Sequence, residues 1–320
     1  MKILIFGGAG FVGSNLVRRC LADPINDITV VDSLAPQLKS TTDALFDIQD
    51  EIRFIRGDIC DDVLLEELVR NHDIIFNCAA QTSHPRSLED PLLDAEINCI
   101  GNLKLLEAVR QYNPRAVVVY PSCSTIIGKA QHPVIDETHG EQPLDIYSAN
   151  KSVAEKYHHI YHTAHDVRTV VLRFANLYGP YGKGSPEFGF LNYFIHLASE
   201  GEDITVYGDG HQTRNVMYIA DAVEILYQSA FNPAIYGKVL FAAHDEHLSV
   251  MDIAKKICST FGQSEVVQVP WPDMRKRIEI DGVHISSQQL RQLAGWYPRF
   301  TFDEGIVQTR MIIERTRQFV

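Results

Sequence analysis

The chain lacks the features that mark several classes of protein. Its six cysteines are scattered with no CxxC spacing, which indicates reduced thiols, not a disulfide frame or a zinc site. Lys and Arg number 29 against 41 Asp and Glu, a net charge of −12, so the basic footprint that nucleic acid needs is missing. No apolar run reaches the roughly 18 residues of a membrane span. Met1 leads directly into a predicted strand, with no signal peptide. We therefore expect a cytoplasmic protein that binds neither nucleic acid nor membrane.

Short apolar runs alternate with helical patterns through the first half of the chain. The predicted strands are residues 2–6, 28–31, 53–56, 73–77, 116–120 and 169–173. Buried strands that alternate with helices predict an α/β fold with a Rossmann-type doubly wound parallel sheet. The predicted helices at 92–112 and 147–165 can pack on this sheet or form a dimer interface, and a homodimer is expected.

The composition of the sequence changes at Gly179. A loop rich in Gly and Pro occupies residues 179–186. Beyond it we predict a strand at 204–207 and helices at 190–200, 221–230 and 250–261. A chain of 320 residues suits one large domain and a smaller one. We predict a dinucleotide-binding domain at 1–178, to which 212–244 return, and a smaller, discontinuous C-terminal substrate lobe from 179–211 and 245–320.

A glycine turn follows the first predicted strand. Gly7, Gly10 and Gly13 have GxxGxxG spacing, with Phe11 and Val12 inside the turn. Glycines there allow a tight turn and a close approach of the backbone to a pyrophosphate at the helix N-terminus. A tight strand–helix turn without a ligand is the alternative. The preceding strand and the amphipathic helix that follows favour a dinucleotide.

Acidic residues end the next two predicted strands. Asp32 closes the second strand, where a carboxylate accepts hydrogen bonds from the adenosine ribose and repels a 2′-phosphate. We therefore predict NAD, not NADP, as the cofactor, although Asp32 could also be a cap. Asp58 and Ile59 follow the third strand, where the adenine edge is expected. A plain turn is the alternative for Asp58.

Tyr147 and Lys151 stand four residues apart in YSANK, which places both side chains on one helix face. The ammonium can lower the pKa of the phenol and hold a nicotinamide ribose, and the phenolate can accept a proton from a substrate alcohol. Lowering a phenol pKa from about 10 to about 7 requires roughly 4 kcal/mol. A unit charge at about 4 Å supplies a similar amount at an effective dielectric near 20. Behind a dinucleotide fold, this pair predicts hydride chemistry.

These motifs together resemble a known family. GGAGFVG at 7–13, NCAAQ at 77–81, YSANK at 147–151 and LRFANLYGP at 172–180 are similar to the extended short-chain dehydrogenases/reductases of the nucleotide-sugar epimerase/dehydratase group. The resemblance covers nearly the whole length. It implies that Ala79, Ala80 and Gln81 lie along the cofactor and that Asn98 braces the site.

On the substrate side, the resemblance implies that Asn176 and Arg214 hold a sugar diphosphate. Arg275 or Arg277 would supply a second phosphate contact, and arginine suits bidentate binding of phosphate. Surface arginines without a ligand are the alternative. His84 lies on the loop that would face the sugar, as an acid/base, a substrate contact or a solvated side chain.

The sequence departs from the family at residues 122–125. Cys123 occupies the place where the family usually carries a Ser or Thr that hydrogen-bonds the reacting hydroxyl. A thiol is a weaker donor and acceptor, so Ser122 or Ser124 could take this role. Related 4,6-dehydratases have Asp-Glu where Ser124 and Thr125 stand, and related decarboxylases have Glu at the place of Thr125. Loss of both carboxyl groups favours simple oxidation and re-reduction.

We therefore expect an NAD-dependent nucleotide-sugar 4-epimerase that works through a transient 4-keto sugar and keeps its NAD tightly bound. Epimerisation at C2, as in CDP-sugar 2-epimerases, remains an alternative. So does a dehydratase or decarboxylase that takes its acid/base from elsewhere, such as His84 or Glu187. A catalytically silent NAD-bound scaffold or sensor is the alternative from a different class.

Overall fold

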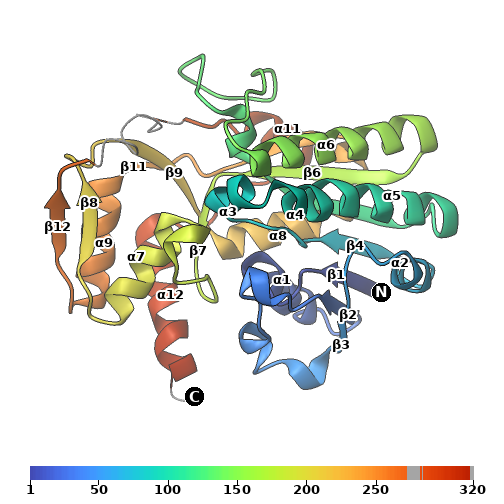
Figure 1. Ribbon diagram of the computed structural model, residues 1–320, viewed down its shortest axis with the longest axis horizontal. Coiled ribbons are helices and arrows are strands. Elements are labelled where there is room, and N and C mark those ends of the chain that lie inside the picture. Colours follow the sequence, from blue (N-terminus) through green and yellow to red (C-terminus); the bar gives the residue numbers. More distant parts are fainter. Residues whose placement is uncertain (272–281, 283, 318–320) are drawn as a thin grey trace.

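The protein is described here by a computed structural model, which covers residues 1–271, 282 and 284–317. A central sheet between two layers of helices forms the larger body, and a smaller lobe lies beside it (Figure 1). The sheet has the order β10-β6-β5-β4-β1-β2-β3, and all of its pairings are parallel. Its strands are β1 (Lys2–Phe6), β2 (Asp27–Asp32), β3 (Arg53–Arg56), β4 (Ile74–Asn77), β5 (Val117–Cys123), β6 (Arg168–Phe174) and β10 (Val239–Ala242).

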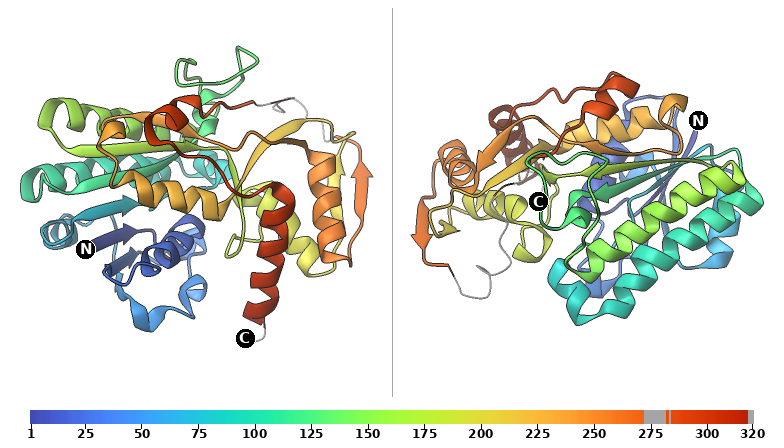
Figure 2. Two further views of the ribbon diagram at one scale, coloured as in Figure 1. Left: turned by 180° about the vertical axis from the view of Figure 1, so that it is seen from behind. Right: turned by 90° about the horizontal axis from the view of Figure 1, so that it is seen from above.

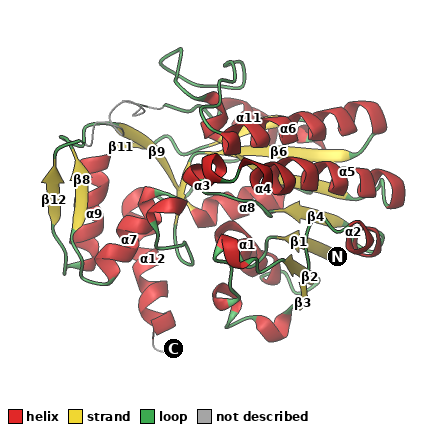
Figure 3. Cartoon of the chain, in the orientation of Figure 1, coloured by secondary structure: helices red, strands yellow, loops and turns green. Residues whose placement is uncertain are grey.

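The central strands are apolar on both faces because helices cover both sides of the sheet (Figure 3). Along β1, Ile3 and Ile5 belong to one buried cluster, whereas Leu4 and Phe6 belong to another. The first cluster includes side chains of α1 (Phe11–Leu21) and α8 (Ile219–Ser229). The second includes side chains of α2 (Asp62–Val69), α5 (Gly101–Tyr112) and α6 (Ile146–His165). The predicted doubly wound parallel sheet is confirmed.

The smaller lobe consists of helices and two small sheets (Figure 2). Its helices are α7 (Phe190–Ser199), α9 (Val250–Phe261) and α12 (Phe302–Arg317). One sheet pairs β8 (Ile204–Tyr207) with β12 (Val266–Val269), and the other has the order β11 (His247–Ser249), β9 (Thr213–Tyr218), β7 (Asn176–Tyr178). Of these strands, only β8 was predicted from the sequence. Strands β7 and β11 have three residues each and β12 has no buried residue, whereas β9 is six residues long and was missed. A further helix, α11 (Gln288–Ala294), contacts β10.

The helix expected at residues 92–112 is interrupted. The structure has α3 (His84–Glu89), α4 (Pro91–Ala95), a π-helical turn at Glu96–Ile100 and then α5. The wider turn contains Asn98, whose side-chain amide donates 2.8 Å to the carbonyl of Gln81. The Asn98 carbonyl accepts 2.8 Å from the Asn102 side chain. Such turns are frequent at functional sites, and this one directs a buried amide toward the end of β4.

Two expectations about organisation stay predictions. Strand β10 joins the main sheet beside β6, whereas β9 pairs with β7 and β11 in a separate sheet, so residues 212–244 contribute to both parts. The domain division remains a proposal on that basis. Homodimer formation is also untested, and the contacts of α5 and α6 with each other and with the body follow the packing alternative. Among the described helices, none is long and apolar enough to cross a membrane.

Candidate active site

The glycine turn after β1 forms a close-packed cradle. Gly7 has φ +69°, and a Cβ there would lie 2.5 Å from the backbone nitrogen of Ala79. A Cβ on Gly13 would lie 2.2 Å from the carbonyl oxygen of Gly7. Helix α1 begins at Phe11, inside this turn, with no acidic residue in its first turn, so its positive end is available to an anion. Only glycine allows β1, β4 and α1 to approach this closely.

A cavity of about 330 Å³ opens in front of this cradle at the carboxyl ends of β1 and β2. Ten of the predicted cofactor residues line it: Gly7, Gly10, Phe11, Val12, Gly13, Asp32, Asp58, Ile59, Ala79 and Ala80. This is the edge of a doubly wound sheet where ligands bind. The sequence therefore brings these residues together at one place.

Asp32 is buried with its carboxylate held in place. One oxygen accepts 3.1 Å from Ala9 N, and the other accepts 3.0 Å from Ser40 Oγ and 3.0 Å from Leu34 N. Asp58 caps a turn, because its Oδ1 accepts 2.9 Å from Cys60 N, and it also lines the cavity. Both carboxyl groups are thus fixed before any ligand binds.

Gln81 and Asn98 stand behind the cavity, and neither is among its described lining residues. The Gln81 side chain is buried and donates 2.8 Å to Asp94 Oδ2 and 2.9 Å to the carbonyl of Ser83. Asp94 also accepts 2.8 Å from Asn150, one residue before Lys151. The Oδ1 of Asn98 is buried without a partner among the described residues. The two amides brace the end of β4 against α4 and α6.

A second cavity of about 260 Å³ adjoins the first, since Phe11, Val12, Cys78 and Ala80 line both. Its walls include Tyr147 and Lys151 from α6, residues 121–125 at the end of β5, and residues 188–192 from the lobe. The predicted catalytic pair thus lines a cavity that lies between the end of β5 and the lobe and adjoins the dinucleotide cavity.

Tyr147 and Lys151 are both buried, and burial dominates their pKa values. It raises the pKa of Tyr147 well above its ordinary value, with the neighbouring Cys123 thiol adding to the effect. Burial lowers the pKa of Lys151 from 10.5 to about 8. The Lys151 ammonium donates 2.8 Å to the carbonyl of Pro121 and lies 4.0 Å from the Tyr120 ring centre. Desolvation is thus the largest influence on the pKa of Tyr147 in this arrangement, and the lowering of that pKa by Lys151 stays a prediction.

The thiol of Cys123 belongs to a row of small polar groups under Tyr147. Its Sγ lies 3.0 Å from Thr125 Oγ1, which in turn accepts 2.9 Å from Ser148 Oγ. Burial raises the pKa of Cys123, so the thiol stays protonated at neutral pH. Ser122 and Ser124 also line the cavity, and Ser122 Oγ is buried with no hydrogen-bond partner among the described residues.

His84 is held at the wall of this cavity. Its ring stands edge-on to Tyr147, with ring centres 4.8 Å apart at 74°, and its Nδ1 lies 2.6 Å from Asp145 Oδ2. Sequence reasoning missed Asp145. An Asp just before an apolar-periodic helix is a typical N-cap, and Asp145 Oδ1 does accept 2.7 Å from Ser148 N.

The predicted substrate residues are dispersed. Asn176 lines the second cavity, and its side chain donates 3.0 Å to the carbonyl of Asn215. Arg214 lies on β9, and its Nη1 donates 2.9 Å to the carbonyl of Thr213. Arg275 and Arg277 fall outside the described residues.

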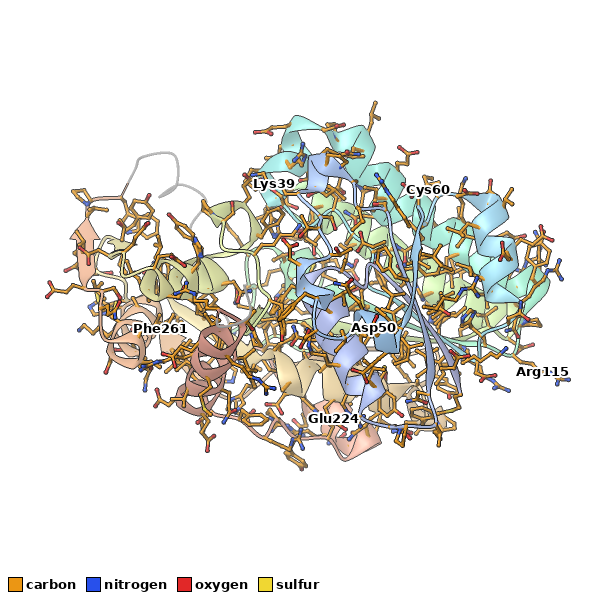
Figure 4. All side chains as sticks on the ribbon, turned by 90° about the horizontal axis from the view of Figure 1, so that it is seen from below. Lys39, Asp50, Cys60, Arg115, Glu224 and Phe261 are labelled. Carbon is orange, nitrogen blue, oxygen red and sulfur yellow. The ribbon has the colours of Figure 1, made fainter. Side chains whose placement is uncertain are left out.

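The lobe also reaches across the first cavity. Lys183 Nζ donates 2.7 Å to the carbonyl of Leu38, and Lys39 Nζ donates 2.8 Å to Glu187 Oε1. Lys39 is labelled in Figure 4 on the loop that follows β2. Glu187 is thus paired with Lys39 on the outside, and is not among the described residues that line the second cavity.

Comparison with known proteins identifies the family. A model described as "NAD dependent epimerase/dehydratase family" matches residues 3–235, well over half of the chain. The chain belongs to this family. The chain is therefore an extended short-chain dehydrogenase/reductase, as the motifs indicated.

Relatives of this NAD dependent epimerase/dehydratase family member have more than one activity. A putative UDP-glucose 4-epimerase of Methanocaldococcus jannaschii is 30% identical, with 95% of each chain covered. A dTDP-glucose 4,6-dehydratase of Streptomyces niveus is 28% identical and covers 97% of this chain and 91% of its own. The UDP-glucose 4-epimerase of Thermus thermophilus, solved in complex with NAD, has a TM-score of 0.85 at 28% identity, with both chains fully covered.

The residues of the first cavity fit NAD. The cradle has no room for side chains at Gly7 and Gly13, and the first turn of α1 beside it contains no acidic residue. The fixed carboxylate of Asp32 suits a ribose diol and opposes a 2′-phosphate. Gly7, Gly10 and Gly13 would hold the pyrophosphate, and Asp32 the adenosine ribose.

Replacing Asp32 with Asn tests this reading. The amide keeps the shape but loses the charge, and hydrogen bonds to charged groups contribute about 1.5–3 kcal/mol. We expect roughly a 10-fold or greater rise in the Kd for NAD in Asp32→Asn, together with weaker discrimination against NADP. Equilibrium dialysis against each coenzyme measures both effects. Equal NAD affinity in the variant would show that the Asp32 charge does not contact the ribose.

Proposed function

We propose that this protein is a nucleotide-sugar 4-epimerase that keeps its NAD tightly bound. The observation that carries the proposal is the content of the second cavity. Tyr147 and Lys151 line this cavity, which adjoins the dinucleotide cavity, and no Asp or Glu is among its described lining residues. Oxidation and re-reduction at one carbon need a single base, whereas the related 4,6-dehydratases have a pair of carboxyl groups for the loss of water.

The side chains support this chemistry as follows. When bound, NAD supplies a hydride acceptor and a positive charge. Tyr147 takes the proton of the C4 hydroxyl as the ketone forms, and returns it when the alcohol is restored. A cation beside the phenol opposes the effect of burial on its pKa. Lys151, fixed by Pro121, adds a second positive charge and holds the ribose.

The rest of the cavity orients the sugar. Phe188, Phe190 and Leu191 of the lobe face β5 and β7 across it. Asn176 and Arg214 would bind the diphosphate from neighbouring strands, with β7 and β9 in parallel register. A 4-keto sugar that turns over in this space receives its hydrogen on the opposite face, which inverts C4.

A panel of UDP-, CDP-, GDP- and dTDP-sugars tests the proposal. An epimer has the mass of its substrate, a dehydratase product lacks water, and a decarboxylase product lacks carbon dioxide. We expect an isobaric product with inverted C4, identified by mass spectrometry and proton NMR, without added coenzyme. Inversion at C2, loss of water or loss of carbon dioxide would assign one of the other activities, and no product at all would favour a silent NAD-bound scaffold.

Cys123→Ser tests the unusual thiol. A hydroxyl is a better donor and acceptor than a thiol, and a net hydrogen bond is worth about 0.5–1.5 kcal/mol. We therefore expect kcat to rise by about 2- to 10-fold in Cys123→Ser, measured by initial rates on the substrate identified above. Cys123→Ala, which removes the group, is the matched control and should be slower than the wild type. A large fall in the Ser variant would mean that the thiol itself is used.

A further inference from the structure

His84 is the one imidazole among the described residues of the second cavity. It lies near the N-terminus of α3, where Ser83 caps the helix by accepting 3.3 Å from Arg86 N. The Ser83 carbonyl accepts 2.9 Å from the buried Gln81 side chain. The His84 side chain is 41% exposed. It is therefore anchored at the wall of the cavity but remains open to solvent.

Asp145 orients this imidazole. Its side chain is 16% exposed and is fixed on two sides, by His84 Nδ1 at 2.6 Å and by Ser148 N at 2.7 Å. Burial alone would raise the pKa of Asp145, but the hydrogen bonds from His84 and Ser148 outweigh it and lower that pKa. An ionised carboxylate at Nδ1 favours the tautomer that carries its hydrogen there. The lone pair of Nε2 is then available as a base.

Inversion at C4 does not require the pair formed by His84 and Asp145. One proton leaves the C4 hydroxyl and returns to it, and Tyr147 suffices for that step. The imidazole is packed against the ring of Tyr147, with ring centres 4.8 Å apart. A sugar whose C4 hydroxyl contacts Tyr147 would therefore bring the neighbouring ring carbons close to this imidazole. Glu187, the other residue considered from the sequence, is paired with Lys39 outside the cavity.

We propose that His84, oriented by Asp145, is a second acid/base catalyst that removes and returns the hydrogen on the ring carbon next to the transient ketone. This inference rests on the proposed function, because only a neighbouring ketone makes that hydrogen acidic. Asp145 is the positioning residue. The site would then exchange hydrogen at C3 or C5, and could invert that carbon as well as C4.

The step balances within the named groups. Nε2 of His84 takes the proton, the C–H electron pair forms the carbon–carbon double bond of an enolate, and the carbonyl π electrons move to oxygen. Tyr147, which holds the proton taken from the alcohol, donates a hydrogen bond to that oxygen. Return of the proton from His84 restores the ketone. Because the exposed imidazole exchanges with water, the returned hydrogen comes from solvent.

The test follows solvent hydrogen and sugar hydrogen separately. The full chain with its bound NAD is incubated in D₂O with UDP-glucose, dTDP-glucose and CDP-glucose, and the sugars are analysed by mass spectrometry and NMR. Parallel samples with deuterium at C4 report transfer to the coenzyme. We expect solvent deuterium on the carbon next to C4 in the wild type. In His84→Gln the ratio of this exchange to C4 transfer should fall by at least about 100-fold.

Two further variants sharpen the result. Asp145→Asn keeps a capping side chain for α6 but removes the charge, and we expect the same ratio to fall and its pH profile to move. His159→Gln alters an exposed histidine on the same helix and is the matched control, with no change expected. Thermal melts confirm that each variant is folded.

The outcomes separate the two proposals. If C4 deuterium reaches the coenzyme but the sugar gains no solvent deuterium, the second acid/base is absent and the 4-epimerase proposal stands. An unchanged ratio of exchange to C4 transfer in His84→Gln would also overturn the inference. If the ratio is unchanged because both rates fall equally, His84 is a positioning residue for Tyr147. If no sugar transfers its C4 hydrogen, the proposed function fails.

Discussion

Tyr147→Phe is expected to lower turnover by about 10²- to 10⁴-fold, the usual contribution of a positioned acid/base. The substitution removes one oxygen from a buried ring and leaves its packing against His84 intact. The hydroxyl neighbours the Cys123 thiol, so its loss leaves only a weak acceptor unpaired. The loss of activity should therefore occur without a loss of fold.

Three measurements on Tyr147→Phe check this expectation. Initial rates give the fall in kcat, and the fraction of purified protein that carries NAD should match the wild type, because Asp32 and the glycine cradle are untouched. The thermal midpoint should change by only a few degrees. Near-normal turnover in the variant would mean that another group takes the alcohol proton, and Ser124 and Thr125 are among the described hydroxyls in the cavity.

The sequence predicted the sheet and the cofactor cavity well because both follow from short-range patterns. Buried parallel strands are continuous apolar runs, and a glycine turn between strand and helix has one geometry. Asp32 and Asp58 line the cavity because they end neighbouring strands whose carboxyl ends share an edge. The YSANK spacing likewise placed Tyr147 and Lys151 on one face of α6.

The contacts that the sequence could not predict join distant segments. Nothing near His84 signals that Asp145, 61 positions later, will lie 2.6 Å away. The π-helical turn around Asn98 accompanies a hydrogen bond from the Asn98 side chain to the carbonyl of Gln81. The helical periodicity of the sequence gives no sign of this turn. The partners of Lys151 were also missed, since its carbonyl acceptor comes from the end of β5. These features depend on tertiary packing.

The ion pair of Lys39 with Glu187 also depends on tertiary packing, and it concerns the retention of NAD. It joins the loop after β2 to the lobe, and Lys183 makes a second link to Leu38. The link between Lys183 and Leu38 spans the first cavity, since both are lining residues. An exposed ion pair contributes little by itself. We expect the two links to limit separation of the lobe from the body and so to slow the release of NAD from the first cavity.

Lys151→Met is expected to lower turnover by at least about 100-fold without lowering thermal stability at pH 7. Burial depresses the pKa of Lys151 from 10.5 to about 8, which corresponds to a cost of about 3 kcal/mol for keeping the ammonium charged in the folded state. Methionine fills the space of the side chain without that cost. The carbonyl of Pro121 loses its donor, which offsets about 1–3 kcal/mol of the gain.

The stability difference between Lys151→Met and the wild type should change with pH. Below about pH 8 the ammonium is charged in both the folded and unfolded states, so the wild type bears the full cost of burial. Between about pH 8 and 10.5 the unfolded chain binds more protons at Lys151 than the folded chain, and the stability that this residue contributes rises with pH. The variant lacks that slope. Its thermal midpoint relative to the wild type should therefore be highest at pH 7 and fall steadily toward pH 10, as calorimetry can measure. A difference that stays constant across this range would mean that Lys151 is not desolvated in the folded protein, and that the ammonium beside Tyr147 is stabilised by water, not by the carbonyl of Pro121 and the ring of Tyr120.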